Sequence, residues 1–249
     1  MKLNLIDVLI YLLLFIFVVC LPIDLLKTGI VVELIIKISV RLILLLFYFY
    51  IIHKREGNIF YRLTFKEFIL FLPFFIICFS NIFASLIDGG FNYVKTDGVV
   101  LFLGIVLCLF TALLEEIVFR FFIHSSLVEH KPIPRILLSA LIFGLCHLVN
   151  LANVRSVDAL LNVLLQMVYT FGLGLVLGFV FEFSHSLILV TILHFCFNLF
   201  NDVLYSFFGG YTSDIAFILT AVVISLLVVL YTLFLYFKKF KKGQQETLS

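Results

Sequence analysis

Long runs of apolar residues, separated by short polar segments, extend along the whole chain. Read against the charged, proline and glycine residues between them, these runs predict eight spans, at about 5–21, 29–52, 68–87, 98–123, 136–150, 158–182, 187–208 and 214–237. An α-helix of about 20 apolar residues crosses roughly 30 Å of hydrocarbon. A membrane β-strand would alternate apolar and polar residues, and these runs show no such alternation. The pattern therefore predicts an all-α fold, a polytopic membrane helical bundle of about eight transmembrane helices.

Composition favours the same class. Of the 249 residues, 64% are hydrophobic and 13% are charged, and the mean hydropathy is +1.26. A soluble domain has about 45–50% apolar and about 25% charged residues. No polar stretch is long enough for a separate soluble domain, so residues 1–249 are predicted to form a single integral membrane domain. The net charge of +2 is too small to indicate nucleic acid as a partner, and we expect membrane lipid instead.

The distribution of lysine and arginine predicts the orientation. With a cytoplasmic N-terminus, 12 of the 17 lysine and arginine residues fall on the cytoplasmic side, and only Lys27, Lys95 and Arg155 fall on the outer side. Because cytoplasmic loops carry an excess of these residues, we expect a multi-pass membrane protein with both termini in the cytoplasm.

Three groups of polar residues interrupt the apolar spans. They are Glu115, Glu116 and Arg120 in the fourth span, Phe143 and His147 in the fifth, and His194 and Asn198 in the seventh. A charged group at mid-bilayer costs several kcal/mol unless it is paired or hydrated, which makes such residues functional candidates. A single histidine in an apolar run is more often a packing residue, so the combination carries the prediction.

Helical spacing indicates how these groups face one another. Glu116 and Arg120 are four residues apart with the acid first, which favours an ion pair and leaves Glu115 free to face another partner. His194 and Asn198 have the same spacing and share a helix face. Counted from the predicted inner ends at 1.5 Å per residue, the three groups lie at similar depths. We therefore expect one hydrated pocket in the inner half of the membrane.

Peptide hydrolysis is the chemistry that these side chains suit. A partly desolvated carboxylate can take a proton from water, while histidine and asparagine polarise a carbonyl or stabilise the oxyanion. Zinc is an alternative, with His147 and His194 as ligands, because imidazoles, a carboxylate and water form common catalytic sites. The chain has no H-E-x-x-H or G-x-S-x-G motif, and its five cysteines form no C-x-x-C pair. Both the metal-assisted and the metal-independent forms stay open.

The three groups match, in order and on separate spans, the motifs E-E-x-x-x-R, F-x-x-x-H and H-x-x-x-N/D. The chain thereby resembles the CAAX-protease and bacteriocin-processing (CPBP, or Abi) family of intramembrane proteases. The motif region runs from about 98 to 208, and the eight-helix layout is also similar.

This resemblance implies an endopeptidase that acts on a membrane-associated peptide or small protein, with a CAAX-type or a bacteriocin- or leader-type sequence, in a bacterial cell membrane. Glu115 would activate water, and Glu116 with Arg120 would brace the site. The remaining three motif residues, His147, His194 and Asn198, would bind a metal or stabilise the oxyanion.

Two other functions are compatible with such a sequence. A non-catalytic bacteriocin self-immunity protein, or another membrane partner protein, would keep the fold and act by binding. An ion-coupled transporter would also place carboxylates and histidines in helices, but it would more naturally show corresponding polar sites in two halves of the chain.

Overall fold

The computed structural model describes residues 4–56, 97–127 and 131–204, together with short pieces between 71 and 82 and between 222 and 237. Within these residues every regular element is helical, which confirms the all-α prediction. The elements are α1 (Leu5–Val19), η1 (Ile23–Leu26), α2 (Ile30–Glu56), α5 (Gly98–Glu116), η2 (Ile117–His124), α6 (Pro132–Cys146), η3 (His147–Asn153), α7 (Val157–Ser184), α8 (Leu187–Asn198) and η4 (Leu199–Val203).

Among the described residues, three helical stretches are long and apolar enough to cross a membrane: Gly98–His124, Pro132–Ala152 and Val157–Ser184. The shorter helices Leu5–Val19 and Leu187–Val203 are also apolar. The spans predicted at 68–87 and 214–237 lie mostly outside the described residues. Large apolar side chains such as Leu5, Phe102 and Val157 are more than half exposed. An apolar surface of this extent is suited to lipid rather than to water, and the chain is an integral membrane protein.

Short polar side chains fix where several helices begin. Asp97 accepts a hydrogen bond from the Val99 backbone N–H at 2.7 Å and caps α5. Ser156 caps α7 and Ser186 caps α8 in the same way. These side chains satisfy backbone donors that lack a partner within the helix.

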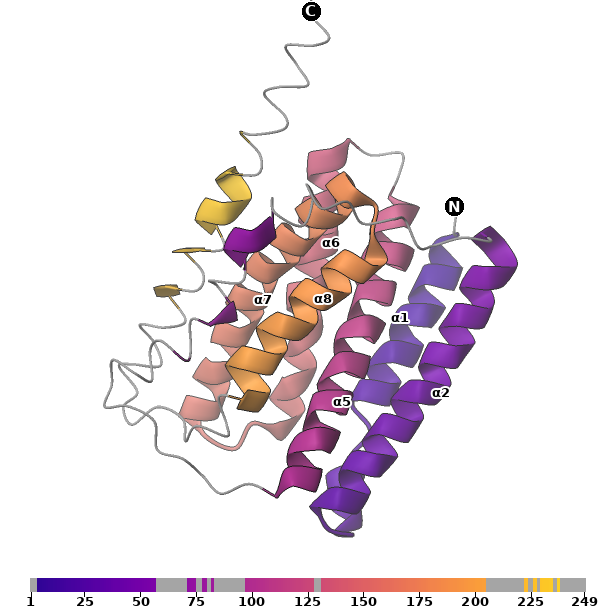
Figure 1. The fold of residues 1–249 in the computed structure, drawn as a ribbon, viewed down its shortest axis with the longest axis vertical. Coiled ribbons are helices and arrows are strands. Elements are labelled where there is room, and N and C mark those ends of the chain that lie inside the picture. The colour runs from indigo at the N-terminus through magenta and orange to yellow at the C-terminus, as the bar shows by residue number, and fades with distance from the viewer. Residues whose placement is uncertain are drawn as a thin grey trace, which may run out of the picture.

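The helices form a bundle in which α1 and α2 stand side by side at one end, α5 lies in the middle, and α6, α7 and α8 lie beyond it (Figure 1). An aromatic group joins the first part to the middle. The Tyr48 hydroxyl donates to the Tyr11 carbonyl at 2.5 Å, and both rings pack on Phe122 of η2. The group holds α1 against the segment that carries the polar motif.

Close packing of α6 against α7 depends on glycine. A Cβ added at Gly174 would lie 3.0 Å from the Ala140 Cα, and one at Gly178 would lie 3.1 Å from the Ile136 side chain. The G-x-x-x-G pair therefore brings the two helices together, as such pairs do in other membrane bundles. Because α6 is short and ends at Cys146, His147 is the first residue of η3. It faces the space beyond the end of α6.

Candidate active site

A buried ion pair forms the base of the site. Glu116 and Arg120 are 0% exposed, and the Arg120 Nε lies 3.0 Å from the Glu116 Oε2. This contact confirms the pair predicted from the spacing. The Arg120 Nη1 donates to the Ser139 Oγ at 3.2 Å, and Ser139 donates onward to the Phe119 carbonyl at 2.8 Å. Ser139 thus ties Arg120 to α6.

Arg120 lies in a π-helical segment, Ile117–His124. Wider helical turns of this kind are rare and are frequent at functional sites. The Arg120 guanidinium carbon lies 5.4 Å from the centre of the Phe143 ring, within the range of a cation–π contact. Among the described residues its Nη2 has no hydrogen-bond partner. Phe143 of the F-x-x-x-H motif therefore packs directly on Arg120 of the E-E-x-x-x-R motif.

His194 connects α8 to both glutamates. Its Nδ1 lies 2.7 Å from the Glu116 Oε1, and its Nε2 lies 3.3 Å from the Glu115 Oε2. A carboxylate only accepts hydrogen bonds, so Nδ1 donates to Glu116. The imidazole ring of His194 thus lies between the carboxylates of Glu115 and Glu116. We call Glu115, Glu116, Arg120 and His194 the site cluster.

His147 joins this cluster through an aromatic ring. The Phe143 ring lies edge-on to the rings of both His147 and His194, at centroid distances of 5.2 and 5.7 Å. The His147 Nδ1 donates to the Phe143 carbonyl at 3.0 Å. This hydrogen bond sets the tautomer of a neutral ring, so its Nε2 keeps a lone pair for another partner.

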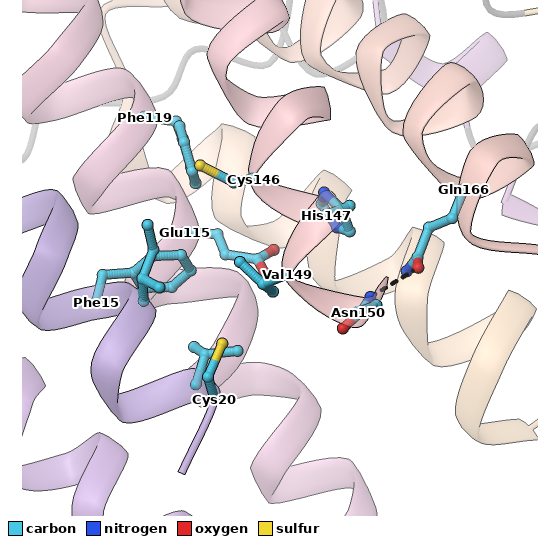
Figure 2. Close-up of a pocket in the computed structure, with 11 residues that line it drawn as sticks. Phe15, Cys20, Glu115, Phe119, Cys146, His147, Val149, Asn150 and Gln166 are labelled. Atoms are coloured by element: carbon cyan, nitrogen blue, oxygen red, sulfur yellow. Dashed lines mark hydrogen bonds between the residues drawn. The ribbon is translucent and has the colours of Figure 1, made fainter. Parts of the chain in front are cut away.

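A cavity of about 180 Å³ lies beside the site cluster. Glu115 and His147 both line it, from α5 and η3 respectively (Figure 2). Glu115 is 9% exposed, whereas Glu116 behind it is fully buried. Apolar side chains, among them Phe15 and Phe119, form much of the remaining wall. The two adjacent glutamates therefore have different surroundings, one at a cavity and one in an ion pair.

The cavity extends from Glu115 to the ends of two helices. Cys20 directly follows the last residue of α1, and His147 and Asn150 follow the last residue of α6, and all three line the cavity. These are the helix ends that the charge distribution predicts to be outer. The depth of the cavity in the membrane stays a prediction.

Asn198 is the predicted residue that the structure leaves apart. It lies on the last turn of α8, as expected from its spacing to His194, but it does not line the cavity. No hydrogen bond from its side chain to another described residue is present. Its part in the site stays a prediction.

Four residues near the cavity escaped the sequence analysis as parts of a site. Ser139, Asn150 and Gln166 are uncharged and carry no motif. Arg41 is a charged residue within the second predicted span, and it was given no part in the site. It is only 8% exposed, and its Nη1 donates to the Lys37 carbonyl at 3.2 Å.

The donor set fits a metal only in part. The Nδ1 of each motif histidine donates to an oxygen, Phe143 O or Glu116 Oε1, as is typical of metal-ligating histidines. Yet the described residues contain no group of three or more His, Cys, Asp and Glu side chains that could hold a metal ion. Zinc held by His147 and His194 therefore stays a prediction, and no step below passes through a metal.

Residues 97–200 match the model of the family described as type II CAAX prenyl endopeptidase Rce1-like. The match confirms the resemblance to the CPBP family, and its range contains every motif residue from Glu115 to Asn198. It indicates a membrane protease with a peptide or protein substrate. Comparison with curated proteins and with solved structures finds no match.

Proposed function

We propose that the chain is an intramembrane endopeptidase that hydrolyses a peptide bond of a membrane-associated peptide or protein, with Glu115 as the base. The observation that carries the proposal is the position of Glu115. Its carboxylate lies on the wall of a cavity and is backed by a fully buried ion pair. The family match at residues 97–200 supports the same reaction class.

In the proposed reaction, a water molecule in the cavity gives a proton to Glu115 as its oxygen attacks the scissile carbonyl carbon. The carbon–nitrogen bond then breaks, and the proton passes to the leaving amine. The products are a carboxylic acid and an amine, which in neutral water become a carboxylate and an ammonium group, and Glu115 returns to its starting form. General acid–base assistance of this kind contributes about 10²–10⁴-fold to a rate.

The rest of the site cluster acts by position. Glu116 accepts from His194 and pairs with Arg120, so both sides of its carboxylate are engaged. His194 in turn contacts the Glu115 carboxylate through its Nε2 at 3.3 Å. Because Glu116 and Arg120 are fully buried, the arrangement is rigid and little reorganisation accompanies proton transfer.

His147 lies on the cavity wall, and no hydrogen bond to its Nε2 is present among the described residues. In its neutral form the ring orients the attacking water by accepting one of its hydrogens. When protonated, the same nitrogen donates to the oxyanion. Asn198 is proposed as a further donor to the oxyanion once substrate is bound.

The substrate proposed from the family is of CAAX type or of bacteriocin or leader type. Both are short sequences that reach the membrane attached to a lipid or to an apolar segment, which fits a cavity with a largely apolar wall. The bacterial cell membrane is the proposed location, with both termini cytoplasmic.

The decisive experiment compares two carboxylates that each contact a histidine. Glu115→Gln and Glu182→Gln are purified into liposomes and given a reporter peptide, since Glu182 contacts His124 but does not line the cavity. We expect Glu115→Gln to lose at least about 10³-fold in kcat, and Glu182→Gln to retain activity. Full activity of Glu115→Gln would overturn the proposal. In a cell that makes the bacteriocin, protection that persists with Glu115→Gln would favour the non-catalytic immunity protein.

Zinc bound by His147 and His194 stays a prediction with its own test. Elemental analysis of the purified protein is combined with peptide cleavage before and after complete chelation. One zinc per chain, lost together with activity and restored with it, would establish metal assistance. Full activity of the metal-free protein would leave Glu115 to act through water alone.

A further inference from the structure

The cavity wall carries a pair of primary amides that the proposed reaction does not use. Asn150 comes from η3 and Gln166 from α7, and the Asn150 Nδ2 donates to the Gln166 Oε1 at 2.9 Å (Figure 2). Both residues line the cavity. The pair therefore holds two polar side chains in a fixed relation on a wall that is otherwise rich in apolar groups.

Counting donors and acceptors shows what the pair offers. A primary amide has two N–H donors and a carbonyl acceptor, and the observed hydrogen bond uses only one donor of Asn150. Among the described residues no other hydrogen bond engages the Asn150 side chain. Asn150 thus keeps one N–H and its carbonyl oxygen. Gln166 is itself held by an interaction with the neighbouring Tyr169 hydroxyl.

One donor and one acceptor on the same planar group are complementary to a peptide bond, which presents a carbonyl and an N–H. In a largely apolar cavity, polar groups of an amide that lack hydrogen-bond partners are unfavourable, and a ligand of matching polarity supplies those partners. Charged ligands would gain less, because the amide pair has no net charge.

The location relates this pair to the proposed chemistry. Asn150 follows His147 by three residues in the 3₁₀ helix η3, and side chains at this spacing eclipse one another. His147, Asn150 and Glu115 all line one cavity (Figure 2). A peptide bond held by Asn150 would therefore belong to the substrate segment next to the bond under attack.

We propose that Asn150, oriented by Gln166, binds the main chain of the substrate beside the scissile bond. The proposal rests on the proposed peptidase function. Asn150 is a substrate-binding residue, and Gln166 is a positioning residue that acts through it. The recognised feature is the peptide backbone, so the pair contributes affinity without selecting a side chain.

The first test separates binding from chemistry. Asn150→Ala and Gln166→Ala are compared with Asn162→Ala, whose side chain lies on the exposed face of α7 one turn away. We expect KM for the reporter peptide to rise about tenfold with kcat changed less than threefold, since one neutral hydrogen bond is lost. Asn162→Ala should behave as wild type. A fall in kcat with unchanged KM would overturn the proposal.

The second test identifies the partner of Asn150. A series of reporter peptides is made with a methyl group on one backbone nitrogen at a time. For wild type, a methyl group at one position near the cleavage site should weaken peptide binding about tenfold. For Asn150→Ala, the same methyl group should weaken binding little further, because both changes remove the same interaction. Independent, additive effects at every position would contradict the assignment.

Peptide binding is also measured directly, with wild type and with the Glu115→Gln protein. If both proteins bind the peptides with the predicted pattern but wild type does not cleave them, the peptidase function fails and the subsite stands. If wild type cleaves all methylated peptides alike, the subsite fails and the peptidase stands. Thermal unfolding of Asn150→Ala in detergent, compared with that of wild type, checks that a loss of binding is not a folding defect.

Discussion

Two polar clusters lie along the continuous helix formed by α5 and η2, and they have nearly the same composition. In the site cluster, Glu116 binds His194 and Arg120. In a second group, which we call the end cluster, Glu182 binds His124 at 2.9 Å and also contacts Arg135. Each cluster joins helices that are distant in the sequence through one glutamate between a histidine and an arginine.

The clusters differ in what adjoins them. The end cluster lies where η2 ends, α6 begins and α7 ends, and none of its three residues lines the cavity. The site cluster has a second glutamate, Glu115, with its carboxylate at the cavity. A histidine–glutamate–arginine group is thus a means of joining helices in this bundle. The additional carboxylate beside a cavity is what distinguishes a candidate active site from a structural contact.

Removing the arginine should separate the clusters most strongly. Arg120→Met leaves Glu116 as a buried charge with one partner fewer, so we expect the free energy of unfolding to fall by about 3–5 kcal/mol. Activity should be lost with it. The double variant Arg120→Met with Glu116→Gln should recover part of the stability, because the uncompensated charge is gone. Thermal unfolding in detergent measures both. Equal stability of the single and double variants would show that the pair is not coupled.

The matching change in the end cluster should have a smaller effect. The Glu182 side chain is 13% exposed, as is that of Arg135, so water screens their interaction more than in the site cluster. We expect Glu182→Gln to lower the free energy of unfolding by about 1 kcal/mol and to leave kcat within about twofold. A loss of activity as large as that of Glu115→Gln would show that the two clusters are functionally equivalent and would break the comparison.

Local spacing explains which parts of this picture the sequence could predict. With α5 and η2 taken as one helix, the apolar runs gave the helices between 98 and 184 to within about four residues, and the four-residue spacing gave the Glu116–Arg120 pair. The meeting of His194 with the glutamates, 78 residues away, followed from the three motifs together. Motif chemistry and helical periodicity are local properties, so they can be recognised in a single amino-acid sequence.

Contacts between helices were beyond such reasoning. His124 and Glu182 are 58 residues apart and lie in spans that carry no shared motif, so nothing in their spacing predicted the end cluster. Ser139, Asn150 and Gln166 are uncharged and their roles depend on which helix faces are opposed. The π-helical turns of η2 also leave no local signal. Packing decides these features, and the early end of α6 decides where the cavity lies.

The prediction with the smallest expected effect on the protein concerns the side of the membrane on which each cluster lies. Cys20 is exposed and lines the cavity, while the end cluster lies at the opposite helix ends. The excess of lysine and arginine predicts that the end cluster is cytoplasmic. A membrane-impermeant maleimide should therefore label Cys20 in intact cells, and Cys20→Ser should abolish the labelling with no change in activity. In the Cys20→Ser background, Lys242→Cys should react only after permeabilisation.

Two other results would contradict this prediction. Labelling of Cys20 only in permeabilised cells would place the mouth of the cavity in the cytoplasm. No labelling in either preparation would show that the cavity is closed to water. Labelling from outside would mean that the substrate segment reaches Glu115 from the outer face, opposite to the end cluster.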